Sequence, residues 1–184
     1  AMNMALAYAD RVNRLVLLAP AASIYRFSRL VKLTLRLAEL KVRPPAGFTL
    51  RMQAGKGMVF DPVFVHLMQM VSEHCVPATM FPTVLTDDEL SRIAQPTLLL
   101  IGGSEKIYNP HNAVARARQL MPNLTAEIVP DAGHTLNMEL PEVVNQRILS
   151  FTCEFVTSGG KNFPSGRFRR EFQPIEWKFR SKIR

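Results

Sequence analysis

The sequence is poor in cysteine and contains no long apolar run. Its two cysteines, Cys75 and Cys153, are too few and too far apart in 184 residues for a disulfide framework or a cysteine-rich zinc site. Their scarcity favours a reducing compartment, and we expect a cytoplasmic protein. No apolar stretch approaches the roughly 20 residues that a membrane-spanning helix needs, and no basic region followed by a hydrophobic segment opens the chain.

Acidic side chains are outnumbered, with 15 against 23 basic ones and a formal net charge of +8. Residues 157–184 contain eight basic and two acidic residues, so this segment carries +6 of that charge. Five aromatic residues are interleaved there, a composition that could bind single-stranded nucleic acid or an anionic membrane. We favour a simpler interpretation, a disordered basic tail with neither partner, because charge-rich termini are commonly just solvated.

Two short apolar runs each lead, through glycine, to one ionisable side chain. Residues 98–101 are uninterrupted aliphatic sequence, typical of a strand buried on both faces of a parallel sheet, and Glu105 follows them. Residues 125–129 form the second run, and His134 follows it. A carboxylate and an imidazole at the carboxyl ends of adjacent parallel strands are typical of the second and third members of a nucleophile–base–orienter triad.

These segments resemble parts of the α/β-hydrolase family. Residues 96–105 (PTLLLIGGSE) resemble the strand that leads to the catalytic acid, and residues 130–134 (PDAGH) resemble the catalytic-histidine loop. Residues 5–20 resemble the helix after the nucleophile elbow and the next strand. The resemblance covers roughly residues 1–156, and it implies an α/β fold: the C-terminal part of a hydrolase parallel sheet, about three strands, with a helical cap insertion.

The resemblance also implies a serine hydrolase, with carboxylesterase the commonest activity. Glu105 would orient His134, and His134 would take the proton of a serine during hydrolysis of a small apolar ester, without a metal or other cofactor. In this fold the serine precedes the acid and the histidine along the chain. No G-x-S-x-G motif occurs here. We therefore expect the serine to lie upstream of Ala1 and this chain alone to be inactive; a non-catalytic binding protein of the same fold is the alternative.

Asp87 and Asp88 are rival candidates for the acid, since some members of the family recruit it from another strand end. Acidic residues in the first turn of a helix would explain both equally well, and Asp131 lies too near His134 along the loop to be preferred. The remaining histidines have weaker claims. His66 and His74 lie eight positions apart, a spacing that does not favour a shared metal, and His111 is expected to be structural.

The same resemblance divides the chain into a partial hydrolase core (1–22), a helical cap (23–90), a second core part with the acid and histidine loops (91–156) and the basic tail (157–184). Strands are predicted near residues 14–18, 97–101 and 125–129, and helices near 2–9, 28–40, 61–74, 110–120 and 141–151. The proline- and glycine-containing stretch 44–47 should break the cap helices. If further strands of the sheet lie upstream of Ala1, this chain alone would leave the strand at 14–18 with an unpaired edge, which is an aggregation hazard.

Methionine-rich apolar side chains line the second cap helix. They could form a deformable wall for an apolar acyl or alcohol group, or they could simply pack on the sheet, as most apolar helix stripes do. We favour packing on the sheet, and both roles are compatible for some residues. The substrate pocket is predicted to include Met68, Met70, Ile107 and Leu136.

Overall fold

In the computed structural model, which describes residues 1–40, 45–75 and 83–157, the centre is a parallel three-stranded sheet in the order β1-β2-β3. Its strands are β1 (Leu15–Leu18), β2 (Thr97–Gly102) and β3 (Leu124–Val129). The predicted strands are confirmed to within one residue at each end. All six residues of β2, the central strand, are buried, which explains why its sequence is apolar without alternation.

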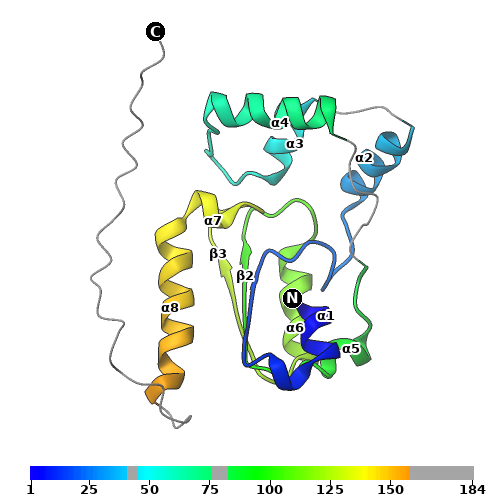
Figure 1. The fold of residues 1–184 in the computed structure, drawn as a ribbon. Helices are drawn as coiled ribbons and strands as arrows, with labels where there is room; N and C mark the ends of the chain where they lie inside the picture. The colour runs from blue at the N-terminus through cyan, green and yellow to red at the C-terminus, as the bar shows by residue number, and fades with distance from the viewer. Residues whose placement is uncertain (41–44, 76–82, 158–184) are drawn as a thin grey trace.

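Helices cover both faces of this sheet, with α6 (Pro110–Leu120) and α8 (Pro141–Thr157) on opposite sides (Figure 1). Side chains of β2 alternate between the two layers, as the pleat of a strand requires. Leu99 and Ile101 join the core on the α6 side, and Leu98 and Leu100 join the core on the α8 side. The predicted apolar faces of both helices are confirmed: Ala113, Val114, Ala117 and Leu120 of α6, and Val143, Val144, Ile148 and Phe151 of α8, pack in these cores.

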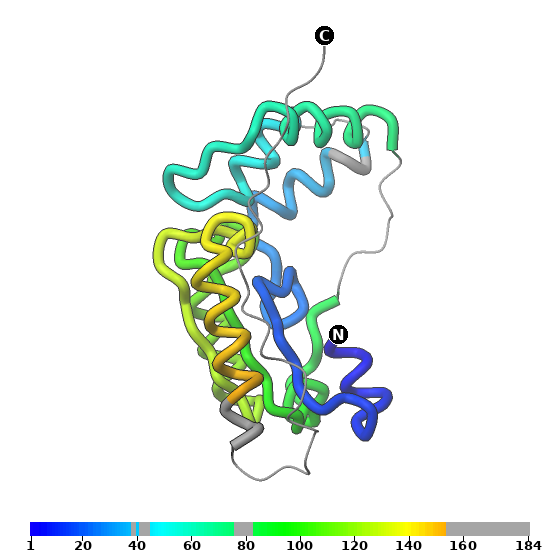
Figure 2. The backbone as a smooth tube through the Cα atoms, turned by 60° about the vertical axis from the view of Figure 1, so that its left-hand side comes forward, coloured from blue at the N-terminus to red at the C-terminus, as the bar shows by residue number. Residues whose placement is uncertain are grey.

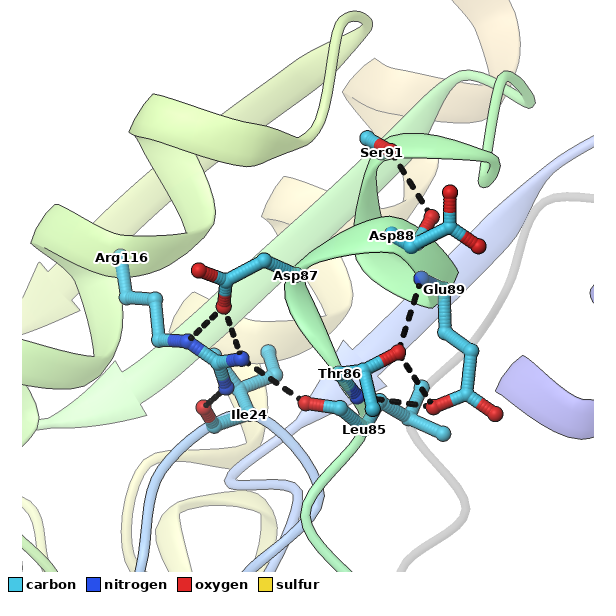
Figure 3. Close-up of polar contacts among 8 residues, drawn as sticks. All are labelled: Ile24, Leu85, Thr86, Asp87, Asp88, Glu89, Ser91 and Arg116. Carbon is cyan, nitrogen blue, oxygen red and sulfur yellow. Dashed lines mark hydrogen bonds and ion pairs between the residues drawn. The ribbon is translucent and has the colours of Figure 1, made fainter.

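The layer on the α6 side also contains α1 (Met2–Ala7), the 3-10 helix η1 (Ala9–Arg11) and the short α5 (Asp87–Ser91). Buried Gln95 ties the first two to the sheet, because its Nε2 donates to the carbonyl oxygens of Ala5 and Ala9, each at 3.3 Å. Thr86 begins α5 with a capping box, in which its hydroxyl accepts from the Glu89 N–H while the Glu89 carboxylate accepts from the Thr86 N–H (Figure 3).

Between β1 and α5 the sequence forms α2 (Arg29–Glu39), α3 (Ala46–Gln53) and α4 (Pro62–His74). We call residues 25–84 the helical excursion. Its helices lie beyond the carboxyl edge of the sheet and do not cover either face (Figures 1 and 2). Asp61 caps α4 by accepting the Val63 N–H at 2.7 Å, as the Asp-Pro sequence predicts.

Two short helices were missed by the sequence reasoning. The expected helix break is present, because α2 ends at Glu39, but a new helix, α3, begins within the stretch 44–47, with Pro45 in its N-cap position. Proline cannot continue a helix but is compatible with its start, since the first N–H groups have no partner within the helix. The four-residue α7 (Leu136–Glu139) follows the histidine loop. The basic tail, from residue 158 onward, lies outside the described residues.

Both ends of the helical excursion are held by one arginine of α6 (Figure 3). The Arg116 guanidinium donates to the carbonyl oxygens of Ile24, before the excursion, and Leu85, after it. It also pairs with the Asp87 carboxylate. The Leu85 N–H donates to the Ser23 carbonyl at 3.0 Å, so the outgoing and returning segments are also joined directly.

Candidate active site

The loops that follow β2 and β3 cross each other at the carboxyl edge of the sheet. The N–H of Gly103 donates to the Val129 carbonyl at 2.7 Å, and the N–H of Ser104 donates to the Ala132 carbonyl at 2.8 Å. A Cβ added at Gly102 would lie 2.3 Å from the carbonyl oxygens of both Ala132 and Gly133. This crossing therefore requires glycine at position 102, which explains part of the Gly-Gly signal in the sequence.

Glu105 and His134 meet where these two loops cross. The His134 Nδ1 lies 2.7 Å from the Glu105 Oε2, within hydrogen-bond distance. The Glu105 side chain is fully buried and that of His134 is 20% exposed. The second carboxylate oxygen, Oε1, accepts the Ile107 N–H at 2.8 Å. The carboxylate is thus fixed by the backbone on one side and bound to the imidazole on the other.

Tyr108 is the nearest buried titratable neighbour of this pair in sequence. Burial raises the pKa of its phenol, and the negative charge of Glu105 raises it further. Its hydroxyl is buried and has no hydrogen-bond partner among the described residues. Tyr108 therefore stays neutral and does not compete with the imidazole for the carboxylate.

Backbone contacts from the helical excursion hold the histidine loop in place. The His134 N–H donates to the Gln53 carbonyl at 2.7 Å, and the Lys56 N–H donates to the Asp131 carbonyl at 3.2 Å. Asp131 has a φ of 61°, a left-handed conformation that turns the chain directly after β3. The loop is therefore tied to residues about 80 positions earlier in the sequence, near the end of α3.

The rival acids lie elsewhere. Asp87 pairs with Arg116 (Figure 3), and Asp88 lies 3.7 Å from Arg92 on the exposed surface of α5. Both belong to the first turn of a helix, as the alternative explanation from the sequence requires. Of the candidate carboxylates, Glu105 is the one that contacts His134. His66, His74 and His111 are exposed residues of α4 and α6.

The four predicted pocket residues are placed differently from one another. Leu136 is fully buried in the core on the α8 side, which leaves it no surface for a substrate. Ile107 packs against the core on the α6 side. Met68 and Met70 lie on α4, with Met70 43% exposed. None of the α4 side chains, all within the described range, is buried; the expected packing of α4 on the sheet is wrong, because α4 contacts α3 instead.

Glu139 is a residue that the sequence reasoning missed. Its carboxylate accepts from the N–H groups of Gly133 and Gly55 and from the hydroxyl of Thr135. The i, i+4 spacing of Thr135 and Glu139 was the available signal.

Among the described residues, no group of three or more His, Cys, Asp or Glu side chains is placed to hold a metal ion. Nor does any helix in the described ranges have the length and apolarity needed to cross a bilayer.

Comparison with known proteins places the chain beside carboxylesterases. No family model matches the chain. Carboxylesterase YbfK of Bacillus subtilis is 52% identical over 73 residues, which make up 40% of this chain and 25% of that protein. The crystal structure of carboxylesterase CesB (YbfK) from Bacillus subtilis matches 83% of this chain with a TM-score of 0.71 and 33% identity. This chain has the α/β-hydrolase fold and is related to carboxylesterases.

Two further structures support the α/β-hydrolase assignment. Naproxen esterase from Bacillus subtilis matches 82% of the chain with a TM-score of 0.70 and 32% identity. A meta-cleavage product hydrolase from Pseudomonas fluorescens matches 84% of it, and 60% of its own length, with a TM-score of 0.67. At 18% identity, this last likeness concerns the fold alone. The chain spans about half the length of the two Bacillus esterases, 55% of each. The predicted fold class is confirmed.

Proposed function

We propose that the chain supplies the acid and the base of a serine carboxylesterase, with Glu105 orienting His134. The observation that carries this is the 2.7 Å contact between a fully buried carboxylate and the partly exposed imidazole. A buried carboxylate bound to Nδ1 favours the tautomer that has its proton on that nitrogen, and it stabilises the imidazolium that forms during catalysis. The relationship to carboxylesterases supports the same reaction.

In the proposed reaction, Nε2 of His134 accepts the proton of a serine hydroxyl as the serine oxygen bonds to the ester carbonyl carbon. His134 then returns the proton to the departing alcohol, which leaves an acyl-enzyme. Water attacks the acyl group with His134 again as base, and His134 then returns the proton to the serine oxygen as its bond to the acyl carbon breaks and the acid product leaves. We place the serine in a G-x-S-x-G motif upstream of Ala1, because the fold orders its triad as serine, acid and histidine.

For the substrate, we propose a small apolar ester, with the helical excursion acting as the cap over the site. Exposed apolar residues of α4, including Leu67 and Met70, support an apolar lining, since they are not used to cover the sheet. We also propose that the protein acts in the cytoplasm, since both cysteines are free and exposed.

Labelling with a fluorophosphonate tests this function in the complete gene product. We expect one serine upstream of Ala1 to be labelled. The variant His134→Ala should slow labelling by at least about a thousandfold, because the serine loses its base. His111→Ala is the matched control, an exposed histidine at the start of α6, and it should label at the normal rate. Absence of labelling, or equal labelling of His134→Ala, would refute the proposal.

A further inference from the structure

We propose that Glu139 is a positioning residue for His134 and that it couples the histidine loop to the helical excursion. Its importance for catalysis depends on the function proposed above, whereas its effect on the imidazole does not. Glu139 ends α7, five positions after His134, and its carboxylate is half-buried against the loop.

The carboxylate of Glu139 holds the residues on either side of His134. The N–H of Gly133 lies 3.1 Å from both carboxylate oxygens, and the hydroxyl of Thr135 donates to Oε1 at 2.8 Å. Between them, the N–H of His134 itself donates to the Gln53 carbonyl. A hydrogen-bond donor of each of the three consecutive residues 133–135 is therefore fixed. The backbone that carries the imidazole has little freedom to rotate.

The same carboxylate reaches the helical excursion. Its Oε2 accepts the N–H of Gly55 at 2.9 Å. A Cβ added at Gly55 would lie 2.3 Å from Oε2, and one at Gly133 would lie 2.4 Å from the Gln53 carbonyl oxygen. The two segments thus approach closely enough for one carboxylate to bind both. Hydrogen bonds to an ionised acceptor are roughly twice as strong as neutral ones, and a glutamine would offer one oxygen where the glutamate offers two.

The acid loop attaches to the same part of the excursion. Lys106, next to Glu105, donates from Nζ to the carbonyl oxygens of Arg51 at 3.0 Å and Ala54 at 3.2 Å. Residues 51–56 therefore contact both the loop that carries the acid and the loop that carries the base. Glu139 joins this stretch, through Gly55, to the histidine loop, through Gly133 and Thr135, so its loss should alter the placement of His134 relative to Glu105.

The test compares Glu139→Gln with Glu142→Gln in the complete protein. Glu142 is an exposed glutamate one residue after the start of α8 and serves as the matched control. We expect Glu139→Gln to lower kcat about 10- to 100-fold with KM within about twofold, since a displacement of about 1 Å costs up to a hundredfold. By nitrogen NMR, the His134 ring should change from mainly the Nδ1–H form to a mixture of tautomers. Glu142→Gln should change neither.

Each outcome decides the matter. Unchanged kcat and an unchanged ring tautomer in Glu139→Gln would overturn the inference. A lower folded fraction with normal kcat per folded molecule would also overturn it, because Glu139 would then act on stability alone. A tautomer change in Glu139→Gln, together with a wild-type protein that shows no esterase activity, would refute the proposed function and leave the positioning role standing. If Glu139→Gln does not fold, Thr135→Val, which removes one donor to Glu139, is measured by the same criteria with smaller expected changes.

Discussion

The sheet and the helical excursion both contain many apolar residues but bury them to different extents. Every residue of β2 is buried, and the α6 and α8 layers exclude water from both faces of that strand. In the excursion, Leu33 of α2 is 54% exposed and Val63 of α4 is 77% exposed. Helical spacing of apolar residues therefore identifies helices in both regions, but it identifies a buried face only for the helices that cover the sheet.

The difference assigns separate tasks to the two regions. Burial of aliphatic side chains is the main source of folding stability, and it is concentrated around β2. The excursion contributes backbone contacts at residues 51–56, which touch both loops of the candidate site. Substitutions around β2 should therefore change the free energy of unfolding, whereas substitutions at residues 51–56 should change the positions of Glu105 and His134.

The largest expected effect is on catalysis. Glu105→Gln should lower the esterase kcat of the complete protein by about a thousandfold or more, since loss of the orienting carboxylate leaves the imidazole in the wrong tautomer. Asp87→Asn, which alters a carboxylate paired with Arg116 instead, should remain within about threefold of the wild type. Steady-state kinetics with a chromogenic ester provides the measurement. Reversal of the two results would transfer the role of acid to α5.

The next effect is on stability and compares one leucine from each region. Leu99→Ala in the centre of β2 should lower the free energy of unfolding by about 2–5 kcal/mol, through lost burial and a cavity. Leu33→Ala on the exposed face of α2 should change it by less than about 0.5 kcal/mol. Urea denaturation followed by circular dichroism measures both. Equal losses would mean that α2 is covered in solution.

The smallest effect compares two glycines. Gly102→Ala should lower the free energy of unfolding by about 1–3 kcal/mol, because its Cβ would collide with backbone oxygens at the loop crossing. A Cβ at Gly47, in α3, meets nothing within 4 Å. Gly47→Ala should therefore raise stability by about 0.5–1 kcal/mol through helix propensity. Thermal unfolding of the two variants checks the sign as well as the size, and destabilisation by Gly47→Ala would show that α3 is more tightly packed than described.

Sequence alone predicts much of the core and the meeting of Glu105 with His134. Strand β2 is recognisable because a strand covered on both faces is apolar throughout. Helices α6 and α8 are recognisable because apolar residues recur every three to four positions along one face of each. The contact between Glu105 and His134 is predictable because residues after neighbouring parallel strands gather at one edge of the sheet. Each of these signals is contained within a few consecutive residues.

Features that depend on distant segments are not predictable in this way. The spacing of Thr135 and Glu139 is a weak local signal, and the contact of Glu139 with Gly55, which lies 84 positions earlier, has no local signal at all. Leu136 is apolar and close to His134, so it suggested a pocket wall, but α8 and the sheet enclose it fully. The start of α3 was missed because proline stops one helix and precedes another with the same local sequence.

Because Arg116 donates to the carbonyl oxygens of both Ile24 and Leu85, we expect that the excursion can be replaced as a unit. With both junctions anchored to α6, residues between them can differ in length and composition without shifting a strand, since loop closure depends only weakly on loop length. A replacement for the excursion would still need a short stretch equivalent to residues 51–56, so that Glu139 and Lys106 keep their hydrogen-bond partners. Swaps that preserve this stretch should alter which molecules are accepted while retaining turnover, and swaps that omit it should retain the fold and lose turnover.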